Sequence, residues 1–506
     1  MSIPALAETF DIRKFDSYRE NNRLEVKAAK DQLPVSLWET YSSFANTDGG
    51  CILLGVKEHK DKSLYPTGIT DADKMRKELW DLLHNPNKVN ICLLTEKDVR
   101  IYEKDGRLIL AIEVPRAKRE EKPVYINDNL FGGTYRRDWE GDYLCSRSTV
   151  LAMLRDQPDD TPDMKILENK ELKDLDQDSI RSYRIRYDAR HEGHPWCDYP
   201  NDEFLMRIGA ASNETSDHRP HPTAAGLLMF GQEYLIMREF PEYFLDYREK
   251  LDPAIRWTDR ITSQSGDWSG NVYDFFSKVY LRLGSDLKKP FKTDGPYRID
   301  ETPVHLAVRE ALANCLVNTD YFQTWSVVIE RYPDRIVMAN PGTIRPGKQQ
   351  MLRGGISQPR NKVMLKMFNL IGIGEHAGSG VPDIFNTWEA ENFKLPTVEE
   401  LSSRSGPDRT VVTLPLARND DFLVISEKQP EKQPETKNEK IMARMKAVLD
   451  LIKTDPNISR PSLAAKLNIS EMQVKTAIEH LKSNGILQYE GAARNGRWIV
   501  HDDNEE

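Results

Sequence analysis

Residues 426–440 constrain the fold of this chain more than any other segment. They read SEKQPEKQPETKNEK, contain no apolar side chain and repeat the tetrapeptide EKQP. A stretch without apolar residues cannot bury a core, so we expect it to be solvated and extended. We assign 421–440 to a flexible linker, and the chain must fold as separately packed parts on either side of it. At roughly 100–200 residues per domain, a chain of 506 residues contains several domains.

The segment after the linker, 441–501, has the signals of a winged helix-turn-helix. Apolar residues recur at helical spacing in three successive stretches between Met445 and Leu481. Two short strand-like runs follow, and Asn495-Gly496 between them favours a hairpin. Three helices followed by a hairpin form a winged helix-turn-helix. An acidic tail, 502–506, comes after it.

Charge makes this module a candidate for nucleic-acid binding. From residue 440 to 501 there are ten Lys and Arg against five Asp and Glu, a net charge of +5 within a chain of -9. The third helix and the wing carry residue types that contact base edges and phosphates, namely Gln473, Lys475, Thr476, His480, Arg494 and Arg497. We expect these residues to bind double-stranded DNA, with RNA as the other nucleic acid. Because winged helices also contact proteins, a protein-interaction role is the alternative.

Composition argues against several other classes of protein. The mean hydropathy is -0.62, and no apolar run approaches the roughly 20 residues of a membrane span. The N-terminus lacks the basic and apolar regions of a secretory signal. The five cysteines are scattered and form no CxxC pair, which argues against a disulfide framework or a zinc ribbon. We expect a cytoplasmic protein that does not enter the membrane.

The N-terminal segment, 1–155, combines helix and strand signals in an α/β pattern. A helix is expected over 34–45 and a buried strand over 51–56, with Gly49-Gly50 reversing the chain between them. Three stretches in order, Glu20–Lys27, Ser43–Gly50 and Leu54–Val56, resemble motifs of the Schlafen/AlbA-type DNA-binding domain, although Val26 stands where the family has Phe. The resemblance implies that this domain contacts nucleic acid.

The same resemblance implies a candidate catalytic site. Animal Schlafens use three carboxylates for metal-dependent RNA cleavage, and the first two map onto Glu20 and Glu25. The third falls at Lys57-Glu58, where Glu58 could substitute. Carboxylates around Mg²⁺ or Mn²⁺ can activate water, but side chains five residues apart converge only across a bend. The alternative is that Glu25 and Lys27 form structural ion pairs on a strand.

A second candidate site lies in residues 301–420, whereas the connecting α/β region, 156–300, shows no catalytic constellation. A helix over 304–321 places Glu310 and Asn314 on one face. An amide oxygen there can bind Mg²⁺ and a carboxylate can hold water. Glycines before a later helix leave backbone N–H groups free for phosphates.

These residues resemble the divergent ATPase domain found after AlbA-type domains in predicted transcriptional regulators, which is related to the gyrase, Hsp90 and histidine-kinase fold. The resemblance implies a site for ATP and Mg²⁺, with the metal held through Asn314, formed by Glu310, Asn314, Asn340, Gly342, Gly378 and Gly380. Two departures weigh against hydrolysis more than against the fold. Asn318-Thr-Asp-Tyr321 replaces His-Arg-Asp-Tyr, and Asn-Pro-Gly replaces the Asp-x-Gly-x-Gly box. No P-loop is present.

Together the segments predict a multidomain α+β protein. It comprises an AlbA/Schlafen-type α/β domain, a central helical and ATPase-like α/β sandwich region, and a C-terminal winged helix-turn-helix. The predicted function is a DNA-binding transcriptional regulator with a nucleotide-responsive ATPase-like domain. We expect a homo-oligomer, because two winged helices on one assembly would raise avidity. The alternatives are a Schlafen-like metal-dependent nuclease in nucleic-acid defence, with ATP as a switch, and a scaffold that contacts only protein.

Overall fold

The computed structural model describes most of the chain, which divides into two compact units, Met1–Asn419 and Asp420–Glu506. The described residues are 10–285, 287, 293–294, 297–298, 301–374, 380–401, 408–418, 437–467, 469, 471–483, 486–490 and 497–500. Only the backbone is described at 293–294, 297–298, 437–444, 446, 465, 473 and 480. The predicted linker up to residue 436, the acidic tail, Gly378 and Arg494 lie outside the described residues.

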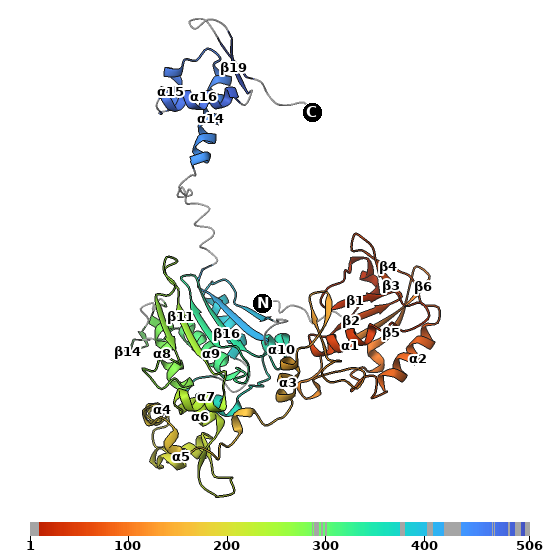
Figure 1. Ribbon diagram of the computed structural model, residues 1–506, viewed down its shortest axis with the longest axis vertical. Helices are drawn as coiled ribbons and strands as arrows, with labels where there is room; N and C mark the ends of the chain where they lie inside the picture. Colours follow the sequence, from red (N-terminus) through yellow and green to blue (C-terminus); the bar gives the residue numbers. More distant parts are fainter. Residues whose placement is uncertain are drawn as a thin grey trace. The chain divides into compact units, whose positions relative to one another are not determined.

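The N-terminal part of the first unit is built on a four-stranded sheet (Figure 1). The strand order is β1 (Leu24–Lys27), β2 (Gly50–Leu54), β6 (Arg107–Val114) and β5 (Val99–Lys104), with β1 parallel to β2 and the other pairs antiparallel. Successive residues of a strand face opposite sides. Ile52 and Leu54 therefore enter a core with α1 (Leu37–Asn46) and α2 (Ala72–Leu83), whereas Leu53 enters a second core with Phe15.

Gly55 corrects the prediction of one strand over 51–56. Its φ of 78° lies in the left-handed region, and a Cβ there would lie 3.0 Å from the Leu108 carbonyl oxygen. Strand β2 therefore ends at Leu54, and β3 (Val56–Glu58) leaves the sheet to pair with β4 (Leu64–Pro66). The remaining elements of this part are the hairpin of β7 (Tyr135–Asp138) and β8 (Gly141–Leu144), helix α3 (Arg147–Asp156), and the short 3₁₀ helices Ile12–Ser17, Glu96–Asp98 and Arg119–Glu121.

The rest of the first unit is built on a six-stranded sheet. Its order is β12 (Asp259–Thr262), β11 (Leu245–Glu249), β15 (Val327–Arg331), β16 (Arg335–Pro341), β18 (Arg409–Pro415) and β17 (Thr397–Leu401), antiparallel except for β11 with β15. Strands β15 and β16 form an antiparallel hairpin. Strands β11 and β12 come from the predicted connecting region, 156–300. The sheet therefore includes strands from both sides of the predicted boundary at residue 300.

This part of the first unit also contains helices, some of which contact the six-stranded sheet. They are α4 (Gln177–Arg190), α5 (Asn201–Ile208), α6 (Ala224–Phe230), α7 (Glu233–Glu239), α8 (Val272–Ser285), α9 (Pro303–Val317), α10 (Lys348–Arg353), α11 (Lys362–Leu370) and α12 (Gly380–Ala390). Smaller elements are β9 (Ala211–Ser212), β10 (His221–Pro222), β13 (Thr293–Asp294), β14 (Tyr297–Arg298) and the 3₁₀ helices Pro162–Met164, Leu172–Asp174 and Pro195–Asp198. Helix α9 packs on β16 with α8 and α12 as neighbours (Figure 1). One core cluster extends from Leu167 to Leu414.

The second unit is a winged helix-turn-helix. Its elements are α14 (Lys437–Thr454), α15 (Arg460–Leu467), α16 (Glu471–Ser483), β19 (Leu487–Glu490) and β20 (Arg497–Val500), the two strands antiparallel. Helix α14 begins at Lys437, so the last four residues of the expected linker are helical. Trp498 closes the core, where its indole N–H donates to the Ile458 carbonyl oxygen at 3.1 Å. No helix in the described ranges combines the length and apolarity needed to cross a bilayer.

Candidate functional site

Helix α9 positions the two residues that the sequence predicts at a nucleotide site. The helix begins at Pro303, after Thr302 caps it by accepting a hydrogen bond from the His305 N–H at 3.4 Å. One turn of spacing brings Asn314 to Glu310, and the Asn314 Nδ2 donates to Glu310 Oε1 at 3.0 Å. This bond uses the amide nitrogen, so the Asn314 oxygen is the atom that remains for a metal ion.

A cavity of about 140 Å³ lies beside this pair. Glu310, Asn314, Asn340 and Gly380 all line it, so the structure brings four of the six predicted nucleotide-site residues together. The rest of its wall is mostly apolar and includes Ile344, Met351, Ile384, Phe385, Val398 and Val412. Apolar walls with a few polar groups suit a purine base, and the carboxylate–amide pair supplies oxygen ligands for Mg²⁺. The residues present therefore fit a nucleotide with its metal.

Gly380 and its surroundings add to this fit. A Cβ at residue 380 would collide with Glu310 Oε1, so glycine allows α12 to begin against the carboxylate. A second cavity also contains Glu310 and Gly380 in its wall, together with the cations Arg190 and Arg309. Phosphate groups of a ligand in the first cavity could extend toward these cations.

Gly342 does not line the cavity beside α9. Its φ is 104°, and a Cβ there would meet the guanidinium of Arg360. Gly342 is needed because the backbone here packs closely against Arg360. Gly342 lines a different cavity, whose wall includes Arg116 and Lys122. Gly378 lies outside the described residues.

The three predicted catalytic carboxylates approach one another in the N-terminal domain. Burial raises the pKa of Glu20, and the negative charges of Glu25 and Glu58 raise it further. A hydrogen bond from the Val26 N–H to Glu20 Oε1 at 2.8 Å acts in the opposite direction and lowers it. Glu58 Oε1 is buried without a hydrogen-bond partner in the described structure. The turn at Gly55 gives Glu58 this position.

Cations also reach this cluster. Glu25 forms ion pairs with Arg137 at 2.8 Å and Lys27 at 3.0 Å, and Glu58 lies 3.3 Å from Lys62. Among the described residues no group of three or more His, Cys, Asp or Glu side chains is arranged to hold a metal ion. The sequence leaves open whether Glu25 is structural or catalytic, and the structure gives it structural ion pairs beside two other carboxylates.

The winged helix presents some of its predicted DNA-binding residues to solvent. Helix α16 buries Val474, Ile478 and Leu481, which leaves Lys475 and Thr476 on the outer face. Lys475 and Arg497 are exposed, and each lies near one carboxylate, Glu479 at 3.9 Å and Glu490 at 3.5 Å respectively. The Thr476 hydroxyl donates to the Met472 carbonyl oxygen at 3.0 Å. The side chains of Gln473 and His480, and all of Arg494, lie outside the described residues.

Family models match successive parts of the chain. The matches are "Schlafen, AlbA_2" over 20–145, "Domain of unknown function (DUF8451)" over 151–246, "Putative ATP-dependent DNA helicase recG C-terminal" over 325–406 and "Winged helix-turn-helix DNA-binding" over 444–488. The domain architecture of the chain is therefore a Schlafen AlbA_2 domain followed by a RecG-type ATPase-like domain and a winged helix. These matches agree with the predicted combination of domains, which is that of a DNA-binding protein. The predicted multidomain α+β fold is confirmed.

Solved structures show more distant similarity. The DIP2311 protein from Corynebacterium diphtheriae is 18% identical, with a TM-score of 0.40, covering 95% of this chain and 91% of its own. The N-terminal domain of a putative ATP-dependent DNA helicase RecG-related protein from Nitrosomonas europaea is 28% identical, with a TM-score of 0.20, covering 26% of this chain and 89% of its own. No curated protein matches significantly.

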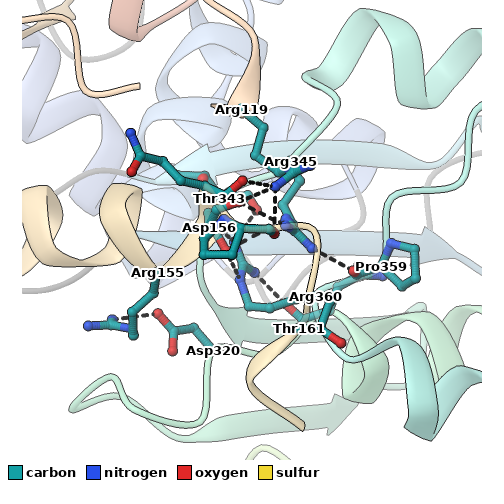
Figure 2. Close-up of polar contacts among 12 residues, drawn as sticks. Arg119, Arg155, Asp156, Thr161, Asp320, Thr343, Arg345, Pro359 and Arg360 are labelled. Atoms are coloured by element: carbon teal, nitrogen blue, oxygen red, sulfur yellow. Dashed lines mark hydrogen bonds and ion pairs between the residues drawn. The ribbon is translucent and has the colours of Figure 1, made fainter. Parts of the chain in front are cut away.

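A cluster of charged residues that sequence analysis misses joins the end of α3, which follows the AlbA_2 match, to the ATPase-like domain. Asp156, at the end of α3, accepts from Arg360 Nε at 3.0 Å and Nη2 at 2.7 Å. Figure 2 shows Asp156 beside Arg345 and Arg360, with Arg119 nearby. Burial would raise the pKa of Asp156, but the charges of the two arginines overcome it and lower the pKa. No local sequence signal pairs Arg360 with a residue 204 positions away.

Proposed function

We propose that this protein is a transcriptional regulator whose winged helix binds double-stranded DNA. The observation that carries the proposal is the outer face of α16, where Lys475 and Thr476 are exposed while the opposite face is buried. A helix in this position of a winged helix-turn-helix enters the major groove, and Arg497 on the wing can contact phosphate. The net charge of +5 over 440–501 favours a polyanion.

Binding of duplex DNA by the full chain at several salt concentrations tests this role. Each phosphate contact contributes about 0.9 to the slope of log affinity against log salt. The double variant Lys475→Ala with Arg497→Ala should therefore lower the slope by about two. Lys453→Ala, at the end of α14, is the matched control and should leave the slope unchanged. An unchanged slope in the double variant would contradict the proposal.

We further propose that the ATPase-like domain binds a nucleotide with Mg²⁺ in the cavity beside α9. The support is the Glu310–Asn314 pair, the apolar wall and the close approach of Gly380. Calorimetric titration of the full chain with Mg²⁺ and ADP should show binding that Asn314→Ala weakens about tenfold. Asn87→Ala, on an exposed turn of the AlbA_2 domain, is the control. Equal affinities for the two variants would remove the proposal.

The proposed regulator acts as a homo-oligomer, in which two winged helices engage DNA together. The proposed assembly makes the second binding event intramolecular, so avidity rises. Sedimentation of the full chain at micromolar concentration tests this part, and a monomer at all concentrations would refute it. Failure here would leave the DNA-binding face of α16 untouched.

A metal-dependent nuclease is the second candidate function. The observation that favours it is the approach of Glu20, Glu25 and Glu58, with Glu58 Oε1 buried and without a hydrogen-bond partner in the described structure. Labelled tRNA or single-stranded DNA with Mn²⁺ should be cleaved by the full chain. Glu20→Gln should abolish cleavage, because it removes a charge while its oxygen can still accept from Val26. Glu103→Gln, an exposed residue of the same domain, is the control. No cleavage by the wild type would exclude this function for these substrates.

A further inference from the structure

A third cavity, distinct from the two that Glu310 lines, lies between the AlbA_2 domain and the ATPase-like domain and is rich in positive charge. Its volume is about 250 Å³. Its wall contains seven Lys and Arg against five Asp and Glu, an excess of two positive charges. Both domains contribute, since Arg116 and Lys122 come from the first and Arg345 from the second. A cavity lined by an excess of cations favours an anionic ligand.

Lys122 is the cation in this wall that forms no ion pair within the described residues, although the charges of Glu400 and Asp48 act on it from farther away. Its Nζ donates to the Asn46 carbonyl oxygen at 2.6 Å, which uses one of three N–H donors. By contrast, Arg116 pairs with Asp48 at 3.2 Å and Arg136 with Asp408. Burial, helped by the charge of Arg116, lowers the pKa of Lys122 to about 7. A bound anion would provide the missing charge.

Glu400 is the candidate carboxylate for pairing with Lys122, but it forms no ion pair with it in the part of the chain that the structure describes. Glu400 borders the same cavity, but one of its oxygens accepts from the Ile344 N–H at 2.7 Å. Burial raises the pKa of Glu400, so its charged form is disfavoured. The cavity therefore keeps its positive excess.

An aromatic ring at the border of this cavity points to more than inorganic phosphate. Trp139 is part of the cavity wall and is 81% exposed. Its φ of 55° lies in the left-handed region, which is unusual for a bulky residue. No ring contact of Trp139 occurs among the described side chains. An exposed indole beside cations is the arrangement on which nucleic bases stack.

We propose that this cavity binds a nucleoside phosphate, with the phosphate on Lys122 and Arg116 and the base against Trp139. A volume of about 250 Å³ suits a free nucleotide better than a nucleic-acid chain. This site is separate from the cavity beside α9, and the proposal does not depend on nucleotide binding there. The two cavities share Thr343 and Arg345 in their walls.

Equilibrium dialysis of the full chain with labelled AMP and labelled inorganic phosphate tests the proposal. An Asn314→Ala background, with Mg²⁺ omitted, reduces the contribution of the cavity beside α9. Lys122→Met should weaken both ligands about tenfold or more, because a charge-assisted hydrogen bond is lost. Trp139→Ala should weaken AMP by about tenfold and leave phosphate unchanged, and Trp139→Phe should retain AMP.

Lys118→Met is the matched control, since it removes an exposed lysine four residues away that does not line the cavity. Its affinities should equal those of the parent. Circular dichroism verifies that each variant is folded, and Trp139→Ala gives an exposed change if Lys122→Met does not fold. Absence of AMP binding at millimolar concentration, or equal affinity in Lys118→Met and Lys122→Met, would overturn the proposal. Binding of a 5′-phosphorylated oligonucleotide without AMP would overturn it in favour of a nucleic-acid end.

Discussion

The ion pair between Asp156 and Arg360 predicts a large loss of stability when one partner is removed. Arg360→Met deletes a bidentate contact in which Nε and Nη2 lie 3.0 and 2.7 Å from the two carboxylate oxygens. It also deletes hydrogen bonds from the guanidinium to the Asn318 carbonyl oxygen at 2.5 Å and the Thr343 carbonyl oxygen at 3.1 Å. The side chains of Arg360 and Asp156 are only 5% and 16% exposed.

Burial determines the magnitude of this effect. Removing one partner of a buried pair leaves an uncompensated charge and costs about 3–5 kcal/mol. Arg345 lies 3.6 Å from Asp156 and can take over part of the pairing, so we expect the lower end, about 3 kcal/mol. The matched control is Arg76, which lies at the same 2.7 Å from Asp73 but on the surface, with side chains 44% and 79% exposed. Arg76→Met should cost about 0–1 kcal/mol.

Urea denaturation of the full chain, followed by circular dichroism and by tryptophan fluorescence, measures both variants. A double-mutant cycle with Asp156→Asn isolates the pair, and the double variant should cost less than the sum of the single variants. If Arg360→Met cost no more than Arg76→Met, or if the two single effects added, the pair would not join α3 to the ATPase-like domain as the structure indicates.

Two further predictions concern packing and protonation. Gly226→Ala should destabilise the chain by about 2–4 kcal/mol, because its Cβ would collide with the Ala210 backbone carbonyl. By contrast, the Cβ in Gly284→Ala would lie 3.6 Å from its nearest neighbour, so this variant should stabilise helix α8 by about 0.5–1 kcal/mol. Thermal unfolding measures both effects. Folding lowers the pKa of Lys122 from 10.5 to about 7, so the unfolded chain binds more protons than the folded chain between these pH values. The free energy of unfolding of the wild type should therefore rise with pH across that window relative to that of Lys122→Met, by up to about 1.4 kcal/mol per pH unit. A difference between the two proteins that is flat from pH 7 to 9 would contradict this prediction.

Local patterns in the sequence predict the elements that depend on neighbouring residues. The spacing of Val474, Ile478 and Leu481 fixes which face of the third helix is buried, and the structure confirms it. The i, i+4 spacing of Glu310 and Asn314 likewise predicts their contact.

Features that depend on distant residues escape this kind of analysis. Gly342 is placed by Arg360, and the six-stranded sheet takes β11 from a region with no catalytic signal, because partners far apart in sequence leave no periodic pattern. The approach of Glu58 to Glu20 depends on a single left-handed residue, Gly55, which moves β3 out of the main sheet.

Arg345 separates the two candidate ligand cavities and gives a test of both together. Its Nη1 donates to the Pro359 carbonyl oxygen at 2.6 Å and its Nη2 to the Asp156 carbonyl oxygen at 2.9 Å, so it is held from the ATPase-like domain and from α3. Because its side chain lines both cavities, Arg345→Met should weaken the ligands of both.

The pattern across three variants makes this prediction specific. In wild-type background, Asn314→Ala should affect only Mg²⁺-dependent ADP binding and Lys122→Met only metal-independent AMP binding, each by about tenfold, while Arg345→Met should reduce both. Asp156 remains paired with Arg360 in that variant, so the domain junction persists. If Arg345→Met matched either single-site variant, one cavity would not bind its ligand through this arginine. If it matched wild type for both, the shared wall would have no part in binding.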